Sequence, residues 1–187
     1  MKASWSQDTY INTYLFAAQA HCRQLVPGTD LPYIVHVNFV VMEVIAALAV
    51  ENEHDGNLAV QCALLHDVIE DTDITYAQVE AKFGQTVADG VLSLSKDKKL
   101  QLGDSLDRIR KQPHEVWMVK LADRITNLQP PPHYWTKDKM IQYRAEALLI
   151  HDALRDASPL LAARLMGKIE AFMEFIEGCQ EMDGQQR

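Results

Sequence analysis

Hydrophobic and polar positions along this chain follow the period of an α-helix, in segments separated by glycine, proline or short polar runs. Residues 8–24 carry apolar side chains at helical spacing, and the loop VPGTDLPY ends the pattern. Residues 36–50 are apolar almost all round, which favours a helix in the centre of a bundle, although their β-branched content leaves a strand open. Residues 58–71 are predicted to form the next helix.

Capping signals predict the remaining elements. Thr75 with Gln78 three residues later is typical of a capping box, and Gly84 ends that helix. Ser158 and Pro159 have the residue types of an N-cap and a first helical position. Further helices are predicted over residues 105–111, 115–128, 136–156 and 158–178. The pattern therefore predicts an all-α fold with a single domain over residues 1–178 and a flexible C-terminal tail over residues 179–187.

Composition limits the classes of protein that this chain can represent. Its 187 residues are 48% hydrophobic and 24% charged, as expected for one globular domain. The three cysteines are odd in number and widely spaced, which predicts reduced thiols and a cytoplasmic location. No apolar run approaches the roughly 18 residues of a membrane span. The net charge of −8 opposes nucleic-acid binding, so an anionic substrate would need local cations or a metal.

The stretch LLHDVIEDT, residues 64–72, crowds His66, Asp67, Glu70 and Asp71 onto one side of the predicted helix. Three carboxylates so close repel one another and would have raised pKa values unless a cation lies among them. A solvated acidic helix end is the ordinary interpretation of an acidic run. The aliphatic residues on both sides argue against it, because aspartate rarely enters apolar surroundings without a partner.

Two other segments offer polar side chains of the same kind. In VKLADRITNL, Lys120, Asp123 and Asn127 share one stripe of a helix, although a surface ion pair would also explain the aspartate. In PYIVH, His36 begins an apolar helix, where a core or capping histidine is the simpler interpretation. Together the segments predict a mixed nitrogen and oxygen site for a divalent ion such as manganese or iron. The predicted ligands are His36, His66, Asp67 and Asp123.

These motifs resemble a known family. PYIVH, ALLHDVIEDTDIT, KFG, LSKDK and VKLADRITNL occur in the order seen in the HD-domain phosphohydrolases, and more specifically in the small alarmone hydrolases. Those proteins are stand-alone relatives of the RelA/SpoT hydrolase domain. The resemblance covers residues 15–128, with weaker similarity to about residue 155. The Glu-Asp pair after the His-Asp pair is its most specific part.

The resemblance implies a single-domain, HD-type helical bundle that removes the 3′-pyrophosphate from purine alarmones with Mn²⁺ as cofactor. It assigns the metal to the four ligands above, the activation of water to Glu70 and Asp71, and a substrate contact to Asn127. Further side chains are predicted to bind the nucleotide: Lys98, Arg144, Tyr143 and Arg23. Lys120 and Arg124 are additional cations with either a structural or a substrate role. The expected partner is a small-molecule nucleotide, and the sequence predicts no oligomeric state.

The chain departs from the family pattern before His36. Guanosine-specific relatives usually carry an Arg-Lys pair ten and eleven positions upstream, where this chain has Leu25 and Val26, and Val37 replaces a proline. An aliphatic pair cannot stack on or donate to a base as arginine does. Both (p)ppGpp and (p)ppApp therefore remain candidate substrates. The alternatives are another HD-type reaction, such as 5′-nucleotidase or NADPH phosphatase activity, and a non-catalytic nucleotide sensor.

Overall fold

The computed structural model describes residues 5–96 and 100–184, with side chains described as far as Gly178. Within these ranges the chain is helical and contains no strand, which confirms the predicted all-α fold. The helices are α1 (Gln7–Ala20), α2 (Ile34–Leu48), α3 (Gly56–Leu65), α4 (Val68–Asp71), α5 (Tyr76–Phe83), α6 (Gln85–Leu94), α7 (Leu102–Ile109), α8 (His114–Asn127), α9 (Lys137–Leu154) and α10 (Pro159–Gly184), with a 3₁₀ turn at Arg155–Ala157.

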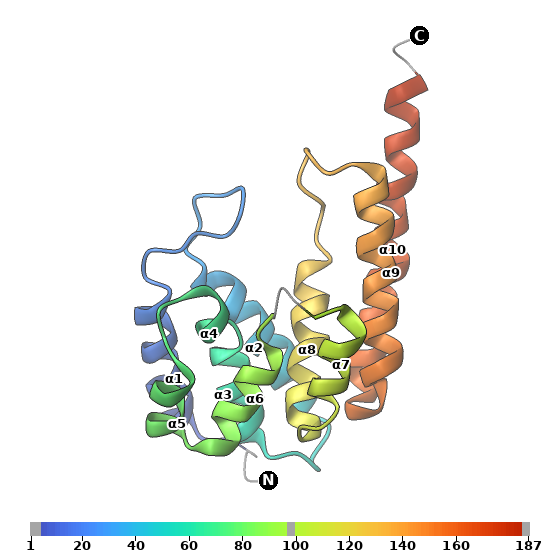
Figure 1. Ribbon diagram of the computed structural model, residues 1–187. Helices are drawn as coiled ribbons and strands as arrows, with labels where there is room; N and C mark the ends of the chain where they lie inside the picture. The colour runs from blue at the N-terminus through green and yellow to red at the C-terminus, as the bar shows by residue number, and fades with distance from the viewer. Residues whose placement is uncertain (1–4, 97–99, 185–187) are drawn as a thin grey trace.

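Helices α2, α3 and α8 pack against one another in the centre of the bundle. Their inward faces are fully buried, as at Val40 of α2, Leu64 of α3 and Leu121 of α8. Helices α1, α5 and α6 cover one side, and α9 and α10 form an antiparallel pair beside α8 on the other (Figure 1). The segment 36–50 thus lies mostly in helix α2 and not in a strand. Its inward face is buried in the core, whereas Phe39 and Met42 on its outer side are exposed.

One predicted helix is interrupted at the position that matters most. The segment 58–71 forms α3 and the short α4, with His66 and Asp67 between them. The His66 imidazole Nδ1 is 2.8 Å from the carbonyl oxygen of Ala63, so it takes the acceptor that a continuous helix would offer to the backbone N–H of Asp67. The prediction of one continuous helix was therefore wrong, and the break gives both side chains a new direction.

Most predicted caps are confirmed. Thr75 and Gln78 form the capping box of α5, and the Ser158 hydroxyl accepts a hydrogen bond from the backbone of Leu161 at 3.1 Å. The last helix reaches Gly184, beyond the predicted end near Gly178. The loop 21–33 and the loop 128–136 lie at the same end of the bundle as α4 (Figure 1).

Two further sequence expectations concern cysteines and membranes. Cys22 and Cys62 are free thiols, the first exposed and the second buried. None of the helices in the described ranges combines the length and the hydropathy that a membrane crossing requires.

Candidate active site

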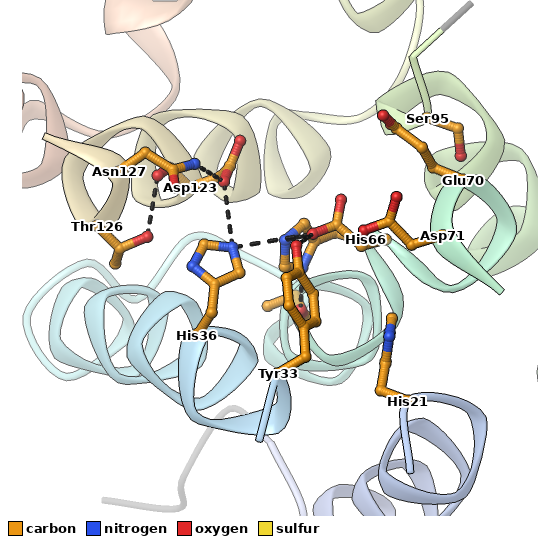
Figure 2. A network of polar contacts seen from close by, with 12 residues as sticks. His21, Tyr33, His36, His66, Glu70, Asp71, Ser95, Asp123, Thr126 and Asn127 are labelled. Carbon is orange, nitrogen blue, oxygen red and sulfur yellow. Dashed lines mark hydrogen bonds and ion pairs between the residues drawn. The ribbon is translucent and has the colours of Figure 1, made fainter. Parts of the chain in front are cut away.

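The polar side chains predicted to bind metal come from three elements of the central bundle. His36 lies in the first turn of α2 and Asp123 in the last turns of α8, and Figure 2 shows both near His66. His66 and Asp67 lie at the break between α3 and α4. His36 Nε2 is 3.5 Å from Asp123 Oδ1 and 3.8 Å from Asp67 Oδ2. The structure therefore brings together four residues that are up to 87 positions apart, counting from His36 to Asp123.

The donor atoms fit a divalent cation. Ligand atoms of His36, His66 and Asp67 all lie within 4.8 Å of one another. The buried His66 Nε2 is 2.8 Å from Asp67 Oδ2, but the angle is not that of a hydrogen bond, and this nitrogen has no hydrogen-bond partner among the described residues. Because Nδ1 faces a backbone carbonyl, Nε2 is the ring nitrogen whose lone pair can face an ion. Two imidazoles and carboxylate oxygens suit a transition-metal ion.

The electrostatics of the metal-free protein point the same way. Burial alone would lower the pKa of His66, but the Asp67 carboxylate outweighs it and raises the pKa to about 9. Burial likewise would raise the pKa of Asp123, but the Lys120 ammonium 3.1 Å away and the nearby histidines hold it well below its usual range. The Asp67 and Asp123 carboxylates are thus ionised, and their negative charge favours binding of a cation between them.

Tyr33 and Asn127 hold the two aspartates in place. The Tyr33 hydroxyl donates to Asp67 Oδ2 at 2.5 Å, and the Asn127 amide donates to Asp123 Oδ1 at 2.5 Å. Burial, and then the Asp67 charge, raise the pKa of Tyr33, so its hydroxyl keeps the proton that it donates. Tyr33 was missed in the sequence analysis because nothing in PYIVH predicts a contact with a residue 34 positions away.

Glu70 and Asp71 of α4 line the same small cavity as the four predicted ligands, with a volume of about 140 Å³. Glu70 is an exposed residue, but its carboxyl faces the cavity, where partial desolvation raises its pKa. The backbone N–H of Lys96 donates to Glu70 Oε2, and Gln24 Nε2 donates to Asp71 Oδ2 at 2.9 Å. Both carboxylates are thus positioned where a water molecule in this cavity would lie beside them.

Two larger cavities share Asn127 with the first. One, of about 560 Å³, is rich in cations: Lys96, Lys120, Arg124 and Lys139 line it. The other, of about 330 Å³, is mainly apolar and aromatic, with Val26, Phe39, Tyr134, Trp135 and Phe172 among its lining residues. His36 lines both the first and the apolar cavity, and Tyr143 lines both larger ones. Asn127 lines all three cavities.

The predicted nucleotide-binding residues are only partly gathered here. Tyr143 lies between the cation-rich and the apolar cavity, and Arg23 lines a fourth hollow of about 710 Å³ beside Glu70 and Asp71. Arg144 instead faces α10, where its Nε donates to the carbonyl oxygen of Ile169 at 3.1 Å. Lys98 lies outside the described residues. For all four residues, binding of the nucleotide stays a prediction.

Three cations of the cation-rich cavity were not predicted to bind the nucleotide from the sequence, or only as additional candidates. Lys96 lies in the LSKDK motif, from which only Lys98 was predicted to bind the nucleotide, and Lys139 lies in none of the motifs; both line this cavity. Arg124 is 8% exposed and stacks on Tyr143, with its guanidinium carbon 4.2 Å from the ring centroid. Its Nε and one terminal nitrogen have no hydrogen-bond partner in the described part of the chain. Such a guanidinium is suited to an anionic ligand.

Comparison with known proteins places this geometry in a family. Residues 13–160 match the family described as HD domain. The guanosine-3′,5′-bis(diphosphate) 3′-pyrophosphohydrolase MESH1 of Danio rerio is 31% identical over 164 residues, covering 83% of this chain and 89% of the relative. MESH1 of Xenopus tropicalis is 32% identical, covering 80% and 87%. The bifunctional (p)ppGpp synthase/hydrolase SpoT of Escherichia coli is 36% identical over 126 residues, which are 17% of its length.

A solved structure agrees with the sequence comparisons. It is described as a metazoan ortholog of SpoT that hydrolyses ppGpp, and it superposes with a TM-score of 0.75 at 28% identity, covering 89% of this chain and 97% of that chain. The fold and the extent of the match agree over most of the molecule. The chain therefore belongs to the HD-domain family, in its MESH1-like branch.

Proposed function

We propose that this protein is a manganese-dependent 3′-pyrophosphohydrolase of purine nucleotides that carry pyrophosphate on the 3′-hydroxyl, of the ppGpp and ppApp type. The proposal is supported by the names of its relatives, which are guanosine-3′,5′-bis(diphosphate) 3′-pyrophosphohydrolases. The observation that carries it is the meeting of three cavities of different chemistry at Asn127, beside the predicted metal ligands.

The three cavities match the three groups that a ribose connects. In a nucleotide with both 3′ and 5′ phosphates, the sugar joins a base, a 3′ anion and a 5′ anion. The 3′-pyrophosphate fits the small cavity with His36, His66 and Asp67, and the 5′-phosphates fit the cation-rich cavity with Arg124. The base fits the apolar cavity. The ribose then lies at the junction beside Asn127, in line with its predicted substrate contact. A substrate with one phosphate would leave a cavity unused.

The chemistry follows from the residues around the small cavity. A divalent ion held by His36, His66, Asp67 and Asp123 would supply Lewis-acid stabilisation of phosphoryl charge and lower the pKa of water beside it. Glu70 and Asp71 are placed to orient the attacking water and accept its proton. Water attacks the phosphorus next to the ribose 3′-oxygen, the bond between them breaks, and the 3′-oxygen takes a proton as pyrophosphate leaves. Lys96 and Lys120, which also line this cavity, can neutralise the charge of the pyrophosphate.

Base selection depends on the apolar cavity. Val26 lines it where guanosine-specific relatives have a basic pair, whereas Leu25 is 51% exposed and pairs with Pro32 across the loop. Aliphatic and aromatic walls hold either purine by stacking and burial, and they discriminate weakly between bases with different polar edges. We therefore expect initial rates on ppGpp and ppApp that differ by less than about tenfold.

A substrate panel tests the proposal. Purified protein with added Mn²⁺ is assayed on ppGpp, ppApp, GMP and NADPH, before and after treatment with a chelator. Turnover of the first two, lost on chelation and restored by Mn²⁺, is expected. Asp67→Ala should abolish turnover and keep the helical circular-dichroism spectrum. Asp107 is an exposed aspartate on α7, and Asp107→Ala should retain turnover. Turnover of GMP or NADPH alone would indicate another HD-type reaction, and nucleotide binding without turnover would indicate a sensor.

A further inference from the structure

A chain of hydrogen bonds outside the predicted site ends on Asp71. Gln24, in the loop between α1 and α2, donates from Nε2 to Asp71 Oδ2 at 2.9 Å. On its other side, Gln24 Oε1 is 2.6 Å from Nδ1 of His21, whose side chain Figure 2 shows at the end of α1, below Asp71. His21 is 2% exposed, and its ring packs on Tyr33 with the ring centroids 5.0 Å apart. Neither His21 nor Gln24 belongs to the residues predicted from the sequence to bind metal, water or nucleotide.

The hydrogen-bond types fix the direction of this chain. An ionised carboxylate only accepts hydrogen bonds, so the amide nitrogen of Gln24 must face Asp71 and its oxygen must face His21. The oxygen in turn requires a proton on His21 Nδ1. Burial lowers the pKa of His21, which favours the neutral ring with a single N–H. His21 therefore holds the Gln24 amide in the one orientation that can donate to Asp71.

The backbone of the loop keeps Gln24 in place independently of its side chain. The carbonyl oxygen of Gln24 accepts from the N–H of Tyr33 at 2.9 Å, and its N–H donates to the carbonyl oxygen of His21 at 3.0 Å. Because these bonds do not involve the carboxamide, a substitution at Gln24 can remove its contact with Asp71 and leave the loop closed. The same loop thus contacts Asp67 through Tyr33 and Asp71 through Gln24.

We propose that Gln24 is a positioning residue for Asp71, oriented by His21, and that it fixes one carboxylate oxygen so that the other faces the small cavity. This inference rests on the proposed function, in which Asp71 orients the attacking water. A carboxylate that rotates freely would spend only part of its time in the productive geometry, and misplacement of this kind lowers turnover more than substrate binding.

The isosteric variant Gln24→Glu separates positioning from packing. Glutamate fills the same volume but presents an oxygen to the Asp71 carboxylate, so the donated hydrogen bond becomes a repulsion. We expect kcat to fall by about 10- to 100-fold with KM changed by less than about threefold. If Gln24 only fills space, Gln24→Glu should leave kcat unchanged. Gln19→Glu, the same charge change at an exposed position of α1, is the matched control and should retain wild-type kinetics.

Kinetics in an Asp71→Asn variant and crystal structures complete the test. If Gln24 acts through Asp71, Gln24→Glu should lower the residual kcat of an Asp71→Asn variant by less than about threefold. Crystal structures of the wild type and Gln24→Glu should show the Asp71 carboxylate rotated in the variant alone. A wild type that releases no pyrophosphate would refute the proposed function, while the crystal structures would still test the contact. An unmoved Asp71 carboxylate, or a kcat within twofold of an active wild type, would overturn the positioning role.

Discussion

Removing the hydroxyl of Tyr33 should weaken metal binding at a site that Tyr33 does not itself ligate. The Tyr33→Phe substitution deletes one oxygen, the donor to Asp67 Oδ2 at 2.5 Å. Tyr33 packs against His21 and His36 with its ring, which phenylalanine keeps, so the ring contacts of the site are preserved. The expected change is therefore confined to the orientation and charge of the Asp67 carboxylate.

The magnitude follows from the type of hydrogen bond. A hydrogen bond donated to a charged group contributes about 1.5–3 kcal/mol. Removing a residue that hydrogen-bonds to a metal ligand typically lowers metal affinity by about 10- to 100-fold. The Asp67 side chain is 18% exposed, so solvent replaces the lost donor only in part. We expect the Kd for Mn²⁺, measured by isothermal titration calorimetry on metal-free protein, to rise by about 10-fold or more.

Tyr76 offers a matched control. Its hydroxyl donates to Asp89 Oδ1 at 2.8 Å, the same pair of groups between α5 and α6, away from the predicted metal ligands. Tyr76→Phe should leave Mn²⁺ affinity unchanged. Equal affinities of wild type and Tyr33→Phe, or an equal loss in both variants, would refute the reasoning that Tyr33 acts on the metal through Asp67.

Three further predictions use other parts of the molecule. The pKa of His66 is raised from its ordinary value of 6.5 to about 9, so in metal-free protein His66 stabilises the fold fully below pH 6.5 and loses this contribution as the pH rises through about 9. Tm should therefore fall between these two pH values in metal-free protein, and it should not fall with Mn²⁺ bound. Gly90→Val should lower stability by about 1–3 kcal/mol in urea denaturation, because a Cβ there would lie 2.9 Å from Cys62 Sγ and Val116 Cγ2; an unchanged midpoint would contradict this packing. Val26→Arg should raise the ratio of kcat/KM for ppGpp over ppApp, and an unchanged ratio would argue against base contact at Val26.

The sequence predicted the elements well because their signals are local. The capping box at Thr75 and the N-cap at Ser158 depend on residues three positions apart, and both are confirmed. The break between α3 and α4 was missed because it depends on a side-chain bond from His66 to the Ala63 carbonyl, which competes with a helical pattern that is otherwise continuous.

The same distinction applies to the site. His36, His66, Asp67 and Asp123 were selected for their residue types in apolar surroundings, and the structure brings them together. Tyr33 and Gln24 were not selected, because their contacts with Asp67 and Asp71 span 34 and 47 positions and follow from how the loop folds back. Arg144 shows the opposite case. Its charge made it a candidate, but packing places its Nε on the backbone of α10.

The identity of the released product tests the central claim most directly. Mn²⁺-loaded protein is incubated with ppGpp and with ppApp, and pyrophosphate, inorganic phosphate and nucleotide are quantified in the same sample. The arrangement of Asp67, Glu70 and Asp71 beside a separate cation-rich cavity predicts one pyrophosphate for each nucleoside 5′-diphosphate formed, with no inorganic phosphate. Release of inorganic phosphate, or no release of either anion from both nucleotides, would contradict the account.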